Sequence, residues 1–250
     1  MPESLIIPSV DLRIGSLEEY NRRQKEKAAH QHHKPKPRPC LTISREFGCA
    51  AYPVAELLRE LMMQRTGDEW VLIDKAILEV VAQRHNISED ILQHLGEKNH
   101  TLDEVLATFS PRWKSDQEYF QLLCRHVISL AEQGNVIIVE LGGGIITRHI
   151  EHSYHFRMYG SMKFKIHTIV RRLNIEAEAA EKLILKQQKL RDHFHRDFLN
   201  QDAHDPALYD MLFNNGRIQP ARIARTIADF VTAEIAADPT RKAPGHEAHC

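Results

Sequence analysis

The amino-acid sequence predicts an α/β fold: a five-stranded parallel sheet with helices on both faces, forming a three-layer sandwich. Short runs rich in β-branched and other apolar residues alternate with longer segments in which apolar residues recur every three or four positions. The segment "NVIIVEL" (135–141) contains an unbroken apolar stretch, which is typical of a strand buried on both faces. No internal repeat is present, so the alternation of strands and helices indicates one parallel sheet.

The predicted elements follow one another along the chain in a regular order. Strands are expected at 40–45, 70–74, 135–141, 154–160 and 208–214. The spacing of Val54, Leu57, Leu58 and Leu61 predicts the first helix. Further helices are expected at 75–85, 117–134, 161–173, 176–199 and 220–236. Gly134 ends the helix at 117–134, because glycine readily adopts the left-handed conformation that closes a helix.

The segments 1–39 and 237–250 differ in composition from the domain at 40–236 that they flank. The N-terminal segment passes from charged to His- and Pro-rich sequence, and its X-Pro steps disfavour helix. We expect a flexible arm here, with a basic segment that docks a protein partner as the alternative. The C-terminal segment is expected to be a disordered tail, and its terminal histidines and cysteine lack the tethering that a metal site needs.

Composition excludes several classes of function. The chain of 250 residues carries a formal net charge of −1, so nothing global favours a nucleic-acid or anionic-membrane partner. No apolar run approaches the roughly 20 residues that span a bilayer. The N-terminus lacks the basic-then-apolar layout of a secretory signal, and the four cysteines show no CxxC spacing. We therefore expect a cytoplasmic protein without a disulfide framework.

The segment that follows the first predicted strand has the position of a phosphate-binding loop. Ligands of parallel sheets bind beyond the carboxyl ends of the strands, where a helix N-terminus suits phosphate. A Walker loop, GxxxxGK[ST], wraps the phosphates with glycines and adds a lysine and a hydroxyl. The segment "SREFGCAAYP" (44–53) has one glycine, Gly48, and neither a lysine nor a serine or threonine opens the helix. By its motif it is not a Walker loop.

Five stretches of the sequence nevertheless resemble one family. "TISREFG" (42–48) followed by a helix resembles the signature S-R-E-F-G-S-G-G-R-E of the cytidylate kinase-like family. In the same order, "VLIDKAILEVVA", "NVIIVELGGGII", "RRLNIEAEAAEKLILKQQKLRDHF" and "HDPALYDMLFNNGRI" resemble its second strand and acceptor-side helix, central strand, helical lid and last strand. The resemblance covers residues 40–236. It implies a P-loop nucleoside monophosphate kinase fold with a lid at about 176–205 and, in active members, phosphorylation of a nucleotide by ATP and Mg²⁺.

The resemblance also implies roles for particular side chains. The phosphate loop consists of Ser44, Gly48, Cys49, Ala50 and Ala51. The catalytic cations are Arg45, Lys189 and Arg191, the acceptor site uses Asp74 and Lys75, and the nucleotide is contacted by Arg196 and Asn214. Lysine at the acceptor pair replaces the family's usual arginine and is a weaker bidentate partner.

Several departures from the family pattern fall where phosphate is held. The Gly-Gly-Arg of the loop is replaced by Ala50, Ala51 and Tyr52, which removes one cation. The two methyl groups restrict any left-handed geometry that the loop requires, at a cost of about 1 kcal/mol per position. The Gly-Arg after the central strand is replaced by Glu140 and Leu141, which removes a second cation.

Four further features leave alternatives open. Glu140 is either a weak metal ligand, as a Walker-B acid is, or a structural carboxylate, and Gln188 stands where the lid usually has Asp. The lysines at 182, 186 and 189 share one helical face, which is either solvated or closes over ATP. The cluster "LGGGII" (141–146) either cradles an anion or packs strand against helix. The histidines at 149, 152 and 155 are expected to be scattered on the surface rather than to bind a metal.

Two functions from different classes fit these observations. One is a pseudokinase: a nucleotide-binding fold with weak or no phosphoryl transfer, and with protein partners recruited by residues 1–39. The other is an active, ATP-dependent kinase for a CMP- or dCMP-type acceptor. Losses concentrated at the phosphate loop favour the first, because this catalysis consists mainly of positioning and cancelling phosphate charge.

Overall fold

The computed structural model describes residues 38–74 and 116–237, which form a sheet with the strand order β2-β3-β1-β4-β5. All strand pairs are parallel. The strands are β1 (Cys40–Arg45), β2 (Val71–Ile73), β3 (Val136–Val139), β4 (Ser153–Tyr159) and β5 (Met211–Asn214). The predicted α/β class and its five strands are therefore confirmed, and the first strand in sequence is the central strand of the sheet.

The helices of the described residues also follow the predicted order. They are α2 (Ala51–Thr66), α6 (Asp116–Gln133), α7 (Gly143–Ile146), α8 (Met162–Leu173), α9 (Ala177–Leu199) and α10 (Pro220–Ala237). The fifth strand begins later than predicted, because Pro206–Leu208 form the 3₁₀ turn η2, which the Asp205 carboxylate caps by accepting the Ala207 N–H at 2.9 Å. The predicted helix at 75–85 and the segments at 1–37 and 238–250 lie outside the described residues.

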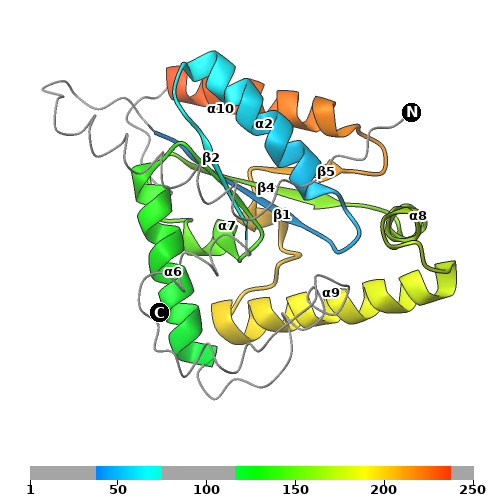
Figure 1. Cartoon of the computed structure of the whole chain (residues 1–250). Helices are drawn as coiled ribbons and strands as arrows, with labels where there is room; N and C mark the ends of the chain where they lie inside the picture. Colours follow the sequence, from blue (N-terminus) through cyan, green and yellow to red (C-terminus); the bar gives the residue numbers. More distant parts are fainter. Residues whose placement is uncertain (1–37, 75–115, 238–250) are drawn as a thin grey trace, which may run out of the picture.

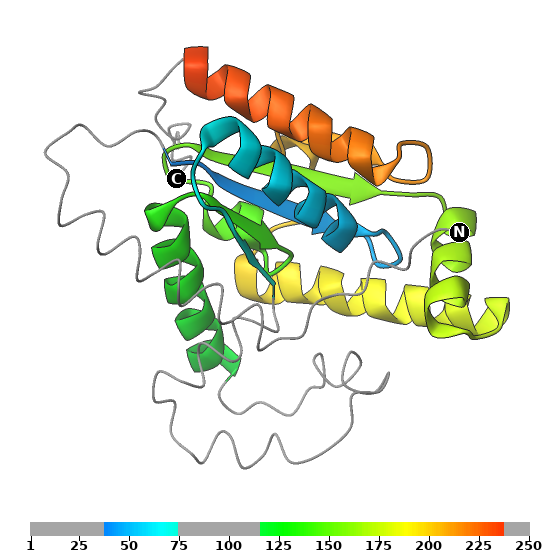
Figure 2. The same cartoon turned by 45° about the horizontal axis from the view of Figure 1, so that its top comes forward.

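The helices form layers on the two sides of the sheet (Figures 1 and 2). Helices α2 and α10 pack against each other and cover one face, whereas α6, α7 and α9 lie on the other. The buried residues of α10, among them Ile223, Ile227 and Val231, recur every four positions, as one face of a helix does. No helix among the described residues is long and apolar enough to cross a membrane.

The side chains of β4 alternate between the two faces of the sheet, as a strand requires. Tyr154, Phe156 and Met158 enter the main apolar core beneath α2 and α10. His155 and Arg157 belong to the opposite face and are buried as well. The expectation of a surface histidine was wrong for His155, because α7 covers this face.

His155 has a structural partner on the neighbouring strand. Its Nδ1 lies 2.9 Å from the Thr42 hydroxyl. No group of histidine, cysteine or acidic residues in the described part of the chain has the arrangement of a metal site.

Candidate functional site

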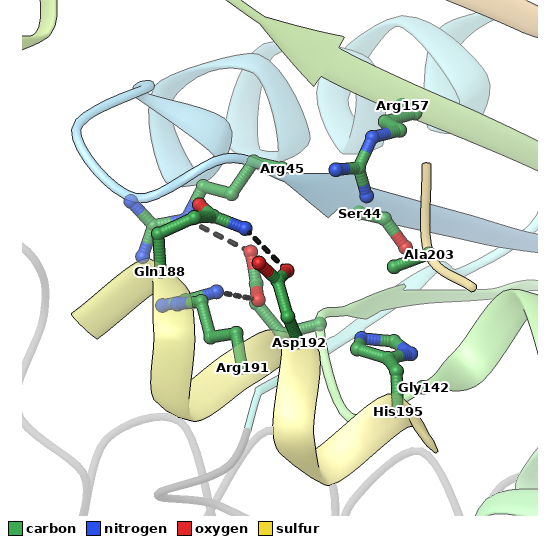
Figure 3. A pocket seen from close by; sticks show the side chains of 10 residues that line it. Ser44, Arg45, Gly142, Arg157, Gln188, Arg191, Asp192, His195 and Ala203 are labelled. Atoms are coloured by element: carbon green, nitrogen blue, oxygen red, sulfur yellow. Dashed lines mark hydrogen bonds and ion pairs between the residues drawn. The ribbon is translucent and has the colours of Figure 1, made fainter. Parts of the chain in front are cut away.

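A pocket lies beyond the carboxyl ends of β1 and β3, on the face of the sheet that α9 covers (Figure 3). After β1 the chain continues to β2, which lies toward one edge of the sheet. After β4 it continues to β5, which lies at the opposite edge. Such a switch point is where open α/β sheets bind ligands. The pocket is lined by Ser44, Arg45, Glu140, Gly142, Arg157, Gln188, Arg191, Asp192, His195 and Ala203.

Glu140 joins two arginines at the edge of this pocket. One carboxylate oxygen accepts from Arg45 Nε at 2.9 Å, and the other accepts from Arg191 Nη1 (Figure 3). All three side chains are largely buried, with exposed fractions of 18% for Arg45, 23% for Glu140 and 13% for Arg191. Burial lowers the pKa of Arg191, and the carboxylate of Glu140 opposes that shift. The two arginines thus share one internal carboxylate, and the three side chains together keep a net charge of +1.

The backbone that presents Glu140 is left-handed over three consecutive residues. The φ angles of Glu140, Leu141 and Gly142 are 71°, 63° and 67°. This conformation suits glycine, whereas it raises the free energy of a glutamate or a leucine by on the order of 1–2 kcal/mol each. Two hydrogen bonds hold the turn: Glu140 N–H donates to Ile43 O, and Gly143 N–H donates to Glu140 O, each at 2.9 Å. The local strain accompanies the placement of a carboxylate between two arginines.

The loop after β1 avoids the strain that the sequence predicted. Gly48 has φ 97°, and a Cβ at this position would lie 2.8 Å from Cβ of Lys165. Ala50 has φ −96°, and Ala51 is the first residue of α2, so neither methyl group meets a left-handed backbone. The expected cost of about 1 kcal/mol per alanine does not arise, because the loop needs only one glycine.

Several N–H groups of the loop are bonded to other parts of the protein. Phe47 N–H donates to Gln188 Oε1, and Ala50 N–H donates to Asn215 Oδ1, each at 2.9 Å. Cys49 N–H donates to the Glu46 carbonyl at 3.0 Å. In a phosphate loop such donors face the ligand. Three of them are already satisfied here.

Comparison with known proteins identifies the family. The model of the "Cytidylate kinase-like family" matches residues 40–217, which is more than half of the chain. This protein belongs to the cytidylate kinase-like family. A search of curated proteins finds no match.

Three solved structures resemble this member of the cytidylate kinase-like family. An uncharacterized protein from Eubacterium ventriosum is 18% identical, with 80% of this chain and 99% of that chain covered and a TM-score of 0.53. Shikimate kinase from Bacteroides thetaiotaomicron is 10% identical, with 80% and 99% covered and a TM-score of 0.43. Dephospho-CoA kinase from Campylobacter jejuni is 11% identical, with 78% and 96% covered and a TM-score of 0.34. Only the first superposes closely enough to describe the fold, and identities this low transfer no activity.

A lysine lies beside the loop, but it comes from another element. Lys165 of α8 is buried against Gly48, and its Nζ donates to the Glu46 carboxylate at 3.0 Å. The same carboxylate accepts the Gly160 N–H at 3.3 Å. Reasoning from the loop motif missed this residue, because it follows Glu46 by 119 positions. Its charge is matched by Glu46.

Cys49, assigned to the phosphate loop, is not a nucleophile in this arrangement. Its side chain is fully buried, and burial together with the nearby Glu46 raises the pKa of the thiol to about 12. The Cys49 carbonyl accepts from Arg45 Nη1 at 2.6 Å. The residue therefore helps to position Arg45 through its backbone.

Helix α9 corresponds to the expected lid. Its polar and charged residues lie on two sides of the helix, one facing the pocket and one facing solvent. Arg191 and Gln188 face the pocket, and Gln188 Nε2 donates to Asp192 Oδ1 at 2.8 Å (Figure 3). Lys189 and Arg196, expected as catalytic and nucleotide-binding cations, are exposed and do not line the pocket. The exposed Lys182, on the same side as Lys189, pairs with Glu178. Of the expected catalytic cations, the structure thus brings together Arg45 and Arg191.

Of the residues expected to contact the acceptor and the nucleotide base, the structure describes Asp74 and Asn214 but not Lys75. Asp74 follows β2 and is half-buried, and Lys75 lies outside the described residues. Asn214 ends β5, and its side-chain oxygen accepts the Gly216 N–H at 3.1 Å, which makes a turn. Its neighbour Asn215 is buried and instead accepts the Ala50 N–H of the loop after β1.

Sequence reasoning missed Arg157, Asp192 and His195 as pocket residues. Arg157 is 4% exposed. Burial lowers the pKa of His195, with Glu140 opposing and Arg157 adding to the shift, so the imidazole is held neutral. The polar alternation in "SYHFRMY" was a signal that His155 and Arg157 share one face of the sheet, because successive side chains of a strand point to opposite faces.

The pocket does not fit a nucleoside triphosphate with Mg²⁺ in this arrangement. It has room for about one water molecule. Two of its arginines are bound to Glu140, and the loop at 50–52 has no serine or threonine to hold a metal. A triphosphate requires Glu140 to leave its two arginines first.

Proposed function

We propose that this protein is a pseudokinase of the cytidylate kinase-like family, with a nucleotide-binding fold and weak or no phosphoryl transfer. The observation that carries the proposal is the contact of one carboxylate, Glu140, with both Arg45 and Arg191. Phosphoryl transfer depends on cations that meet the charge of the transferred group. A cation already paired with an internal carboxylate contributes little to that charge unless the pair breaks.

The bonds of the phosphate loop support the same proposal. Gln188 and Asn215 accept the N–H groups of Phe47 and Ala50, as a phosphate oxygen does in a working loop. A ligand that uses these donors has to displace side chains held at 2.9 Å, so its net gain in free energy is small.

The alternative is an active, ATP- and Mg²⁺-dependent kinase for a CMP- or dCMP-type acceptor. One observation favours it: Arg45 and Arg191 converge at the end of β1, from elements far apart in sequence. For this alternative to hold, bound nucleotide has to move Glu140 aside.

Turnover and thermal stability separate the two. We expect no ATP consumption above background with CMP or dCMP at millimolar concentration with Mg²⁺, and little change in Tm. A ligand at 100 times its Kd stabilises by about 2.7 kcal/mol, which is readily measured. Sustained turnover by the unaltered protein overturns the proposal.

The variant Glu140→Gly shows whether the carboxylate is the obstacle. It restores the residue type that the family usually has, suits the left-handed φ of 71° and frees both arginines. We expect it to gain an ATP-dependent rise in Tm that the unaltered protein lacks. Glu56→Gln, which changes a carboxylate on α2 away from the pocket, is the matched control. A response that is the same in all three proteins contradicts the role given to Glu140.

The arm at 1–39 and the cellular setting belong to the same proposal. We infer that the arm docks a protein partner and that the protein works in the cytoplasm. Removal of residues 1–37, which lie outside the described residues, tests the first point: partner capture by the full chain should be lost in the truncated one.

A further inference from the structure

Among the lysines and arginines in the described part of the chain, Lys165 and Arg157 are the most deeply buried, and they differ in their partners. Lys165 is 9% exposed and pairs with Glu46 at 3.0 Å. Arg157 is 4% exposed and forms no ion pair with any described residue. Its Nη1 donates to the Tyr209 hydroxyl at 3.3 Å, and its Nη2 lies 3.4 Å from His204 Nδ1. Both acceptors are neutral, and both bonds are longer than the usual 2.9–3.0 Å or so.

The contact with Arg157 favours one tautomer of His204. Arginine is only a donor, so a hydrogen bond between them requires His204 Nδ1 to accept and the ring proton to be on Nε2. Nε2 lies 3.3 Å from Asp192 Oδ1, which already accepts from Gln188. Asp192 therefore stands on the far side of the His204 ring from Arg157 and does not contact it.

The charges that line the pocket do not balance. Three guanidinium groups, of Arg45, Arg157 and Arg191, face two carboxylates, of Glu140 and Asp192. Glu140 is committed to Arg45 and Arg191. His195 adds no charge, because burial lowers its pKa, and Arg157 adds to that shift. A buried charge without a counterion is expensive, and the cost is recovered when an anion binds.

We infer that Arg157 anchors a small oxyanion, through a terminal oxygen of a phosphate or carboxylate group that enters the pocket between β4 and α9. The guanidinium reaches the pocket from β4 (Figure 3). Its planar fork has N–H groups beyond those that bond Tyr209 and His204, and these can donate to an oxygen of such a group. The space for about one water molecule accepts one such oxygen, and the rest of the ligand extends through the open side. Ser44, also in the pocket, adds a hydroxyl donor.

This inference rests on the proposed function and deepens it. The nucleotide contacts of the loop and of Arg45 and Arg191 are satisfied internally, so the anion is held by a cation from the middle of a strand. The ligand needs neither ATP nor a metal. Its binding can therefore be measured without any nucleotide.

The test is a titration of the full chain with inorganic phosphate, with sodium acetate and with sodium chloride at matched ionic strength. Tm and calorimetric heat are the readouts. We expect a saturable rise in Tm with phosphate, with acetate or with both, beyond that given by chloride. The stronger of the two identifies the ligand as a phosphate or a carboxylate group. No rise beyond the chloride control overturns the inference.

Arg157→Met assigns the binding to this side chain. Removing the charge while keeping an unbranched apolar side chain should weaken binding at least about tenfold. The ligand-free variant should be as stable as the unaltered protein or more so, because an unmatched buried charge is gone. Arg222→Met, an exposed change on α10, should behave as the unaltered protein does. Equal anion binding by Arg157→Met overturns the inference.

Arg157→Lys covers the case in which the methionine variant does not fold. Lysine keeps the charge but loses the fork, so it should bind the anion more weakly than arginine does. Unchanged affinity overturns the role of the guanidinium. ATP turnover is measured in parallel: turnover without anion binding by Arg157 refutes the inference and the pseudokinase together, whereas anion binding with turnover refutes the pseudokinase alone.

Discussion

The two faces of the sheet bury different kinds of side chain from the same strand, β4. Toward α2 and α10, β4 contributes Tyr154, Phe156 and Met158 to a continuous apolar core. Toward α7 and α9, it contributes His155 and Arg157. The second face is divided: beneath α6 it has an apolar cluster of its own, which includes Ile73, Val127 and Ile138. Only around β4 does it bury charge and hydrogen-bonding groups, which is the arrangement of a site rather than of a core.

The largest effect expected from this comparison comes from the apolar face. Phe156→Ala removes a fully buried ring that lies edge-on to Phe230, and should lower the free energy of unfolding by about 3–5 kcal/mol. Urea unfolding followed by circular dichroism measures this value. On the neighbouring strand, the exposed Leu212→Ala should cost about 0.5 kcal/mol or less. Similar losses for the two variants would contradict the assignment of this face as the core.

A smaller effect, of opposite sign, is expected on α9. Gln187 is 1% exposed, and neither its Oε1 nor its Nε2 has a partner in the described chain. Gln187→Met keeps the length of the side chain and removes both buried polar atoms, so the free energy of unfolding should rise by about 1–3 kcal/mol. The same urea experiment measures it.

The adjacent residue gives the matched control for that change. Gln188→Met removes the bonds to Phe47 and Asp192 and should destabilise. A loss of stability in Gln187→Met would show that the amide of Gln187 has a structural role and that the two glutamines are alike.

The smallest effect concerns pH and the polar face. Burial lowers the pKa of His195 in the folded protein. In the unfolded chain this imidazole takes up a proton near about pH 6.5, whereas in the folded chain it is still neutral at that pH. Stability is therefore lost as pH falls below the unfolded pKa. His195→Gln should make the free energy of unfolding fall less steeply between about pH 7 and pH 5. The change in slope should correspond to at most about one proton bound on unfolding. His193→Gln, an exposed change on the same helix, is the control, and an equal flattening by both variants would contradict the prediction.

The fold was predictable because it depends on local patterns. The apolar stretch around Val136 to Val139 and the spacing of Val54 and Leu58 determine which segments are strands and helices, and each is confirmed. The loss of Walker residues after β1 was visible in the same way, since a motif is a local property.

The residues that line the pocket and contact the loop were not predictable, because they depend on which distant parts of the chain meet. Lys165 and Arg157 come from α8 and β4, and no spacing in the sequence relates them to the loop. Gln188 was recognised only as a departure from the family pattern. Its bond to Phe47 N–H explains what a neutral amide does there, because a carbonyl oxygen accepts without adding charge.

The central position of β1 has a consequence for how the chain is made. Thr42 meets its partner His155 across 113 residues, and Arg45 meets Glu140 across 95. At ribosomal rates of about 5–20 residues per second, β1 waits on the order of ten seconds for either neighbouring strand. Throughout that time an apolar segment with two open edges is exposed. The emerging chain should therefore depend on holding chaperones more than the finished protein's stability would indicate.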